Sequence, residues 1–276
     1  MDWRSRISYT CALTAGLLTY SNIGYSYQAR SSAVTEWTAA CPGDARGYWD
    51  TMCATWRTEL GRKGWTQWWA NYDLVITPRY ADPSLISWGY DNSPSGFDAG
   101  TAAILCTHGG YDYIGWWGLM QNEVENDCGI SVTQMEMGKL SGGSTRFLHL
   151  SSCNSMRWDY TNAWFGPAKG GVHIITGFHG IMYIGSAYVN EYKTMVDDSY
   201  TSASIADSWV DNMYHDPALG PTICPISMAF GQTEAAAKSR LSSERYNTQT
   251  ADTANNFGVL QWVGGCTPDD GGTLPK

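Results

Sequence analysis

Three short apolar segments, each followed at once by small or polar residues, constrain the fold of this chain most. They cover 102–106, 147–150 and 172–176 and lead into His108-Gly109-Gly110, Ser152-Cys153-Asn154 and Gly177-Phe178-His179. Short strands buried on both faces and alternating with helices are typical of an α/β protein with a mostly parallel central sheet and helices on both faces. Because functional residues gather at the carboxyl ends of parallel strands, we expect the three polar ends to converge.

Large apolar residues at helical spacing predict helices around these strands, at 44–60, 204–214 and 234–246, with a shorter helical stretch at 158–168. A short strand is predicted at 74–76, a loop at 82–96, no regular period over 111–145 and a loose tail from 267. No internal repeat or long linker divides the chain. We therefore expect one α/β domain over 1–276, with a strand and helix region at 1–80, a catalytic core at 97–215, and a C-terminal helix and tail at 216–276.

Charge and composition exclude several classes of protein. The chain has 17 basic and 26 acidic residues, a net charge of −9, which argues against nucleic acid as a partner. Its 14 tryptophans and hydrophobic fraction of 43% exclude a disordered chain. No segment approaches the roughly 18 consecutive apolar residues of a membrane span.

The eight cysteines show no close spacing, and a chain of this length does not need disulfides to fold. We therefore expect the cysteines other than Cys153 to be mostly reduced, with Cys106 a small apolar core residue. No CxxC or HExxH pattern is present, so neither a metal nor a cofactor is expected. Two arginines before a weak apolar stretch resemble a signal peptide. Hydroxyl residues interrupt that stretch, so we expect a cytoplasmic protein, with secretion as the alternative.

A strand ending in His108-Gly109, followed 45 residues later by one ending in Ser152-Cys153, resembles the caspase-like cysteine peptidases of clan CD. That clan includes caspases, legumain, clostripain, gingipain and separase. A longer stretch, roughly 45–215, is similar to a little-characterised, mainly bacterial domain family on this fold. The features that carry this similarity are Phe97-Asp98-Ala99, the segment 171–179 and Ser208-Trp209. The Gln-Ala-Cys-X-Gly pentapeptide of caspases is absent, so specificity for Asp is not implied.

The resemblance implies a three-layer caspase-like fold and a Cys-His dyad. Cys153 would be the nucleophile, His108 the general acid and base, and the N–H groups of Gly109 and Cys153 the oxyanion hole. The chemistry agrees, because a thiol attacks an amide as thiolate and an imidazole can take its proton and later protonate the leaving amine. A helix beginning just after Cys153 would favour the thiolate.

Residues around the dyad are candidates for substrate contact. They are Asp112, Ser152, Asn154, Phe178 and His179. Acidic residues after the histidine predict a substrate with a cationic residue at the cleavage site, although a solvated loop is the alternative; they are Asp112, Glu123, Glu125 and Asp127. Four tryptophans are candidate walls of apolar subsites: Trp116, Trp117, Trp158 and Trp164. His149 and His173 lie inside strands, so we expect hydrogen-bonded core side chains there.

The sequence therefore predicts a cysteine endopeptidase, or a related peptide-bond hydrolase or transferase, with a peptide or protein as substrate. One alternative is a non-catalytic module that keeps the fold and uses the cleft for binding. Another is a peptide-maturation enzyme that passes the acyl group to an amine. The oligomeric state stays open.

Overall fold

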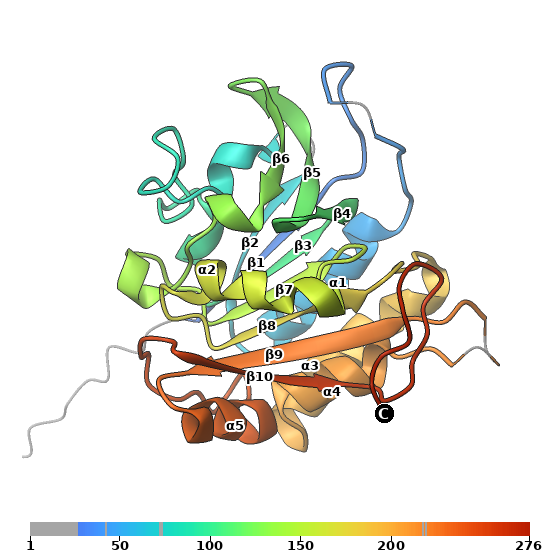
Figure 1. Ribbon diagram of the computed structural model, residues 1–276. Helices are drawn as coiled ribbons and strands as arrows, with labels where there is room; N and C mark the ends of the chain where they lie inside the picture. The colour runs from blue at the N-terminus through green and yellow to red at the C-terminus, as the bar shows by residue number, and fades with distance from the viewer. Residues whose placement is uncertain (1–26, 42, 72–73, 217, 219) are drawn as a thin grey trace, which may run out of the picture.

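The computed structural model describes residues 27–276 except 42, 72–73, 217 and 219. A seven-stranded sheet runs in the order β10-β9-β8-β7-β3-β1-β2 (Figure 1). Its strands are β1 (Gln28–Ala33), β2 (Thr66–Asn71), β3 (Ala102–Cys106), β7 (Phe147–Ser151), β8 (Ile174–His179), β9 (Cys224–Gly231) and β10 (Phe257–Trp262). The first five run parallel, and β9 and β10 each pair antiparallel to their neighbour. The mostly parallel sheet is confirmed, whereas the stretch that resembles a signal peptide lies outside the described residues.

Four α-helices cover one face of this sheet: α1 (Trp49–Arg62), α3 (Val189–Thr201), α4 (Ile205–Met213) and α5 (Glu234–Ser243). α1 packs on β1 and β3, α4 on β8 and β9, and α5 on β9 and β10, with α3 between α1 and α4 (Figure 1). Side-chain caps begin two of them, because Ser204 accepts from the Asp207 N–H and Thr233 from the Ala236 N–H. Trp56 of α1 and Trp209 of α4 are fully buried beneath this layer.

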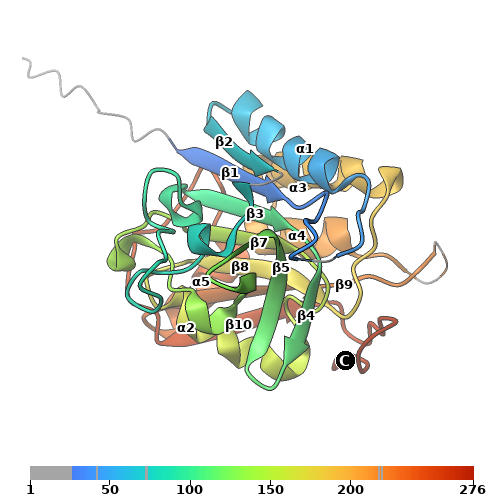
Figure 2. The ribbon, with the colours of Figure 1, turned by 90° about the horizontal axis from the view of Figure 1, so that it is seen from above.

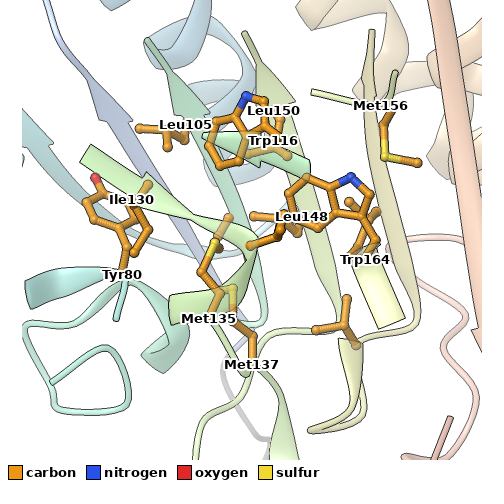
Figure 3. Packing of buried hydrophobic residues seen from close by; sticks show 14 of the residues in the cluster. Tyr80, Leu105, Trp116, Ile130, Met135, Met137, Leu148, Leu150, Met156 and Trp164 are labelled. Atoms are coloured by element: carbon orange, nitrogen blue, oxygen red, sulfur yellow. The ribbon is translucent and has the colours of Figure 1, made fainter. Parts of the chain in front are cut away.

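A second, three-stranded antiparallel sheet lies on the opposite face together with short helices (Figure 2). It consists of β4 (Gly109–Asp112), β5 (Gly115–Val124) and β6 (Asp127–Ser131), accompanied by the 3-10 helix η6 (Trp158–Trp164) and by α2 (Phe165–Ala168). Figure 3 shows Trp116 of β5 and Trp164 packed with leucines of the main sheet. The three-layer α/β architecture is therefore confirmed, with a small sheet added to one outer layer.

Several elements differ from the sequence-based expectations. The strand expected at 74–76 is reduced to one isolated bridge, between Ile76 and Asn122, and the edge strand is β2 instead. The segment 111–145, in which no period was recognised, forms β4 to β6. The alternation of apolar and polar side chains typical of a strand is not visible here, because Gly115, Gly118 and Gly129 interrupt it.

Three disulfides overturn the expectation of mostly reduced cysteines. They join Cys41 to Cys128, Cys53 to Cys106, and Cys224 to Cys266. Their sequence separations of 87, 53 and 42 residues explain the error, because long-range pairing leaves no local spacing signal. Cys106 is thus a cross-link to α1 rather than a plain core residue. The disulfides suggest an extracellular or otherwise oxidising environment instead of the expected cytoplasm. Among the described residues, no helix is long and apolar enough to cross a membrane.

The C-terminal segment, residues 266–276, is attached to the body of the protein rather than loose. Its Cys266 is bonded to Cys224 at the start of β9, and the Leu274 N–H donates to the Cys266 carbonyl at 2.8 Å. The Leu274 side chain is buried. The tail therefore has a defined course along the edge of the sheet where β8 ends.

We predict that Asp91 makes the protein less stable as the pH rises. Burial, with the nearby Asp98 and Asp82 charges, raises the pKa of Asp91 from 3.8 to about 8. The folded state therefore holds a proton that the unfolded state releases above about pH 4, so stability falls from there to about pH 8. Asp91→Asn should raise the free energy of unfolding at pH 8 by on the order of 2 kcal/mol and flatten its pH dependence. Urea unfolding at pH 5 and pH 8 checks this, and an equal change at both values would contradict it.

Candidate functional site

The pairing of β3 with β7 places the predicted nucleophile and base at one edge of the sheet. In this parallel pair Cys106 lies opposite Ser151, and the Thr107 N–H donates to the Ser151 carbonyl at 3.3 Å. His108 and Cys153 each follow two residues after these partners. The sheet therefore brings His108 and Cys153 to matching positions at the carboxyl ends of neighbouring strands.

The imidazole of His108 is held by three groups from the segment before and into α1. Its Nε2 lies 2.8 Å from the backbone carbonyl oxygen of Asp44. A carbonyl can only accept, so Nε2 carries the proton in the neutral ring and Nδ1 is the basic atom. The ring centroids of Trp37 and Trp49 lie 5.1 and 4.8 Å from that of His108. The side chain is thus fixed in one tautomer between two indoles.

Cys153 lies in a tight turn rather than at the start of a helix. The next residue, Asn154, has a φ of 55°, and its N–H donates to the Gly180 carbonyl at 2.8 Å. Regular helical structure begins only at Trp158, so the expected helix dipole is absent from the Cys153 turn. Left-handed backbone at a non-glycine residue is uncommon and carries strain of about 1–3 kcal/mol.

The thiol of Cys153 is half-buried and lies against the segment after β8. The Met182 N–H donates to Sγ at 3.5 Å. Burial raises the pKa of the Cys153 thiol, the negative charge of Asp270 adds to this, and the Met182 N–H and Arg46 oppose it. The resting group is therefore a protonated thiol, so a nucleophilic role requires a base to remove its proton.

Within the described part of the chain, no hydrogen bond joins the His108 imidazole to the Cys153 thiol. Each ring or thiol contact instead goes to backbone: Nε2 to Asp44 and Sγ to Met182. The structure therefore shows two side chains held by backbone groups rather than a formed hydrogen-bonded pair. Catalytic hydrogen bonds are often long in unliganded enzymes and shorten when substrate binds.

The backbone of Gly109 closely approaches the Cys153 turn. A Cβ atom at Gly109 would lie 2.1 Å from Ser152 Oγ and 2.8 Å from the Cys153 carbonyl oxygen, so only glycine fits. Gly109 faces Gly118 in β5, and the Leu119 N–H donates to the His108 carbonyl. This register makes Gly109 a non-hydrogen-bonded position whose N–H points away from β5. Among the described residues no hydrogen bond engages this N–H, so it can donate to a bound ligand.

An open cavity of about 500 Å³ lies next to the histidine. Its lining consists of Gly43, Asp44, His108, Gly109, Trp117 and Leu119. His108 and Gly109, which follow β3, thus border a space of a size that accommodates a few residues of a peptide, whereas no residue of the Cys153 turn lines it.

Of the residues predicted to contact substrate, two have clear local roles in the turns. Asp112 accepts from the N–H groups of Ile114 and Gly115 and so closes the β4–β5 hairpin. Asn154 donates from Nδ2 to Asp270 at 2.8 Å and accepts from Arg157 at 2.9 Å. Their contact with substrate stays a prediction.

The other three predicted contact residues are buried. Ser152 accepts from the Trp116 indole N–H at 3.3 Å, and Phe178 packs against Trp209 in the core. His179 accepts at Nδ1 from the Trp158 N–H and donates from Nε2 to the Gly272 carbonyl at 2.7 Å. Burial lowers the pKa of His179, which fits a neutral ring. None of these three side chains lines the cavity beside His108.

His149 and His173 are hydrogen-bonded core side chains, as expected, although His173 lies just before β8 rather than inside a strand. His149 is hydrogen-bonded to Thr176 and Tyr246, and burial lowers its pKa to about 3. His173 contacts the carboxylates of Glu244 and Asp252 at 2.7 and 3.2 Å. Neither lies at the carboxyl edge of the sheet.

The acidic residues after the histidine do not border the cavity in the described structure. Asp127 accepts from the Gly129 N–H and from Gln134, while Glu123 and Glu125 are exposed on β5 and its turn. Asp44, which sequence reasoning passed over, is the acidic residue of the lining and pairs with Arg46 at 3.3 Å. Trp117 is the one predicted subsite tryptophan that lines the cavity.

Sequence reasoning also missed Trp37, Trp49 and Asp270 as neighbours of the dyad. No pattern in the sequence links them to it, because they lie in a loop, a helix and the C-terminal segment. Among the described residues, no group of three or more His, Cys, Asp or Glu side chains is arranged to hold a metal ion.

Comparison with models of known protein families gave no match, and comparison with curated proteins gave none. Fold and site geometry therefore carry the functional argument.

We predict that Asp270→Asn makes Cys153 react with iodoacetamide at lower pH. Removing a negative charge near the thiol lowers the thiol pKa, so the alkylation midpoint should move to lower pH. Rates measured from pH 6 to pH 10 by mass spectrometry give the midpoint for each variant. The adjacent Asp269→Asn, whose carboxylate accepts from Tyr183, is the matched control and should shift the midpoint less. An equal shift in both variants would contradict the assignment to Asp270.

Proposed function

We propose that the protein is a caspase-like cysteine endopeptidase, or a related peptide-bond hydrolase or transferase, that uses His108 and Cys153. The observation that carries this proposal is the matched position of the two residues after β3 and β7, with His108 lining an open cavity. The Asp44 carbonyl supports it, because a proton fixed on Nε2 leaves Nδ1 able to accept the thiol proton.

In the first half of the reaction, Nδ1 of His108 takes the proton of the Cys153 thiol as Sγ attacks the carbonyl carbon of the peptide. The carbonyl π electrons move to oxygen, and the N–H groups of Gly109 and Cys153 donate to that oxyanion. One such donor lowers the barrier by about 2.7–4 kcal/mol. Because the thiol is protonated at rest, the base must act during attack rather than before it.

In the second half, the His108 imidazolium returns its proton to the nitrogen of the leaving amine as the C–N bond breaks. An acyl group then remains on Sγ as a thioester. Water activated by Nδ1 releases a carboxylic acid and restores the thiol, whereas an amine nucleophile gives a new amide.

The second candidate function is a peptide-binding module without catalysis. The backbone contact of Sγ with Met182, together with the raised thiol pKa, favours this candidate. It predicts peptide binding in the same cavity with no chemical turnover.

The three disulfides support action in an extracellular or other oxidising compartment. We propose that the protein is secreted. Its substrate would be a peptide or protein met there, and the proposal includes no cofactor.

The test measures cleavage of a fluorogenic peptide library by purified variants. Cys153→Ala should abolish cleavage, and His108→Ala should lower turnover by about 10²–10⁴-fold, the usual size of a general acid–base contribution. His215→Ala is a matched control, because His215 follows α4, pairs with Glu191 and makes no hydrogen bond to His108 or Cys153. It should keep turnover near that of the unmodified protein.

Full cleavage by folded Cys153→Ala would overturn the nucleophile assignment. Peptide binding without cleavage by the unmodified protein, with binding retained in Cys153→Ala, would establish the second candidate. Circular dichroism confirms that each variant is folded.

A further inference from the structure

Three groups surround the His108 imidazole, although a Cys-His dyad needs only the histidine and the cysteine. Trp37 and Trp49 lie on either side of the Asp44 carbonyl in the sequence and all three contact one imidazole. We call Trp37, Asp44 and Trp49 the histidine clamp. The Trp37 indole itself lies on Gly43, where a Cβ atom would come within 2.6 Å of the ring. A glycine at 43 is thus needed for the clamp to close.

The two tryptophans of the histidine clamp are not held in place by hydrogen bonds from their indole N–H groups. Within the described residues, the indole N–H groups of Trp37 and Trp49 are buried and lack a hydrogen-bond partner. An unpartnered buried donor costs about 1–3 kcal/mol. Ring packing, rather than hydrogen bonding by the indole N–H groups, therefore holds these two side chains in place. Their rings contact His108 and each other, with Trp37 and Trp49 centroids 6.1 Å apart.

Two disulfides attach the clamp to the rest of the protein. Cys41–Cys128 ties the clamp loop to β6, and Cys53–Cys106 ties α1 to the end of β3, two residues before His108. The Thr38 N–H adds one hydrogen bond, to the Gln121 carbonyl at 3.2 Å. The loop has no strand or helix between Val34 and Tyr48 in its described residues. Its position near His108 therefore depends on the cross-links and on the packing of Val34 and Trp37 against the core, rather than on strand or helix pairing.

We propose that Trp37 and Trp49 are positioning residues for His108 and that the Cys41–Cys128 disulfide keeps them in place. This inference rests on the proposed function, in which His108 is the base. Without the clamp, the imidazole is free to rotate and to exchange its proton between Nδ1 and Nε2. Only the Nε2–H tautomer presents a basic Nδ1, so loss of the clamp reduces the competent fraction of the histidine.

The arrangement has a consequence for redox conditions. Cys153 must be a free thiol, whereas Cys41 and Cys128 must be joined. A dithiol reductant such as dithiothreitol delivers two electrons and two protons to the Cys41–Cys128 bond and itself becomes a cyclic disulfide. Prolonged exposure to the reductants commonly used to keep catalytic thiols active should thus inactivate this protein.

The first experiment records the ¹⁵N shifts of the His108 ring by two-bond ¹H–¹⁵N NMR, a readout that needs no substrate. The unmodified protein should show the Nε2–H tautomer, whereas Trp37→Leu and Gly43→Ala should show a mixture of the two. Trp37→Phe keeps a ring against the imidazole and should restore the single tautomer. Trp65→Leu removes a buried indole at the amino end of β2 and is the matched control for lost packing.

The second experiment measures turnover on the cleaved library peptides. Trp37→Leu and the double variant Cys41→Ala/Cys128→Ala should lower kcat by about 10–100-fold with KM little changed, as for a misplaced catalytic group. Trp37→Phe should restore kcat, and Trp65→Leu should keep it.

The outcomes separate this inference from the proposed function. If His108→Ala lowers turnover but the clamp and disulfide variants keep both the single tautomer and kcat, the clamp inference is wrong and the function stands. If His108→Ala changes nothing, the proposed function is wrong. Gly43→Ala retains every clamp side chain and both disulfides, so it tests the inference even where a double cysteine variant does not fold.

Discussion

Pairing of β3 with β7 in parallel register is the interaction on which the site depends. It sets Cys106 opposite Ser151, so the last residues of the two strands lie side by side. A shift of one residue would send each strand's side chains to the other face and would separate His108 from Cys153. Both strands are fully buried, with Leu105, Leu148 and Leu150 facing the small sheet (Figure 3). The apolar core therefore fixes the register that the polar ends require.

The regions around this pair come from distant parts of the chain and depend on cross-links. A loop before α1 supplies the contacts of His108, and the C-terminal segment supplies Asp270 beside the Cys153 turn. Neither region has much regular structure near the site, so few backbone hydrogen bonds hold them. Each contains one disulfide that joins it to a strand, which limits how far it can move.

The sequence predicted the elements whose signals are local. Apolar runs revealed β3, β7 and β8, and helical periodicity revealed α1, α4 and α5. The residues after two of those strands supplied the candidate dyad, which stays a prediction. The antiparallel strands β4 to β6 were not predicted, because glycines interrupt the alternation of apolar and polar side chains. The disulfides and the contacts of Trp37 with His108 escaped because they join residues tens of positions apart. Such contacts depend on the folded topology, which no local pattern encodes.

The burial of Cys153 bears on how the chain acquires its disulfides. Among the described residues, the free thiol of Cys153 accompanies three disulfides and endangers their correct pairing, because a thiolate attacks disulfides and exchanges them. The raised pKa of Cys153 keeps the group protonated near neutral pH, and a protonated thiol does not take part in this exchange. The turn that encloses Sγ, with the Met182 N–H against it, also limits access. Once this turn has formed, the Cys153 thiol does not exchange with the completed disulfides, so their native pairing is preserved.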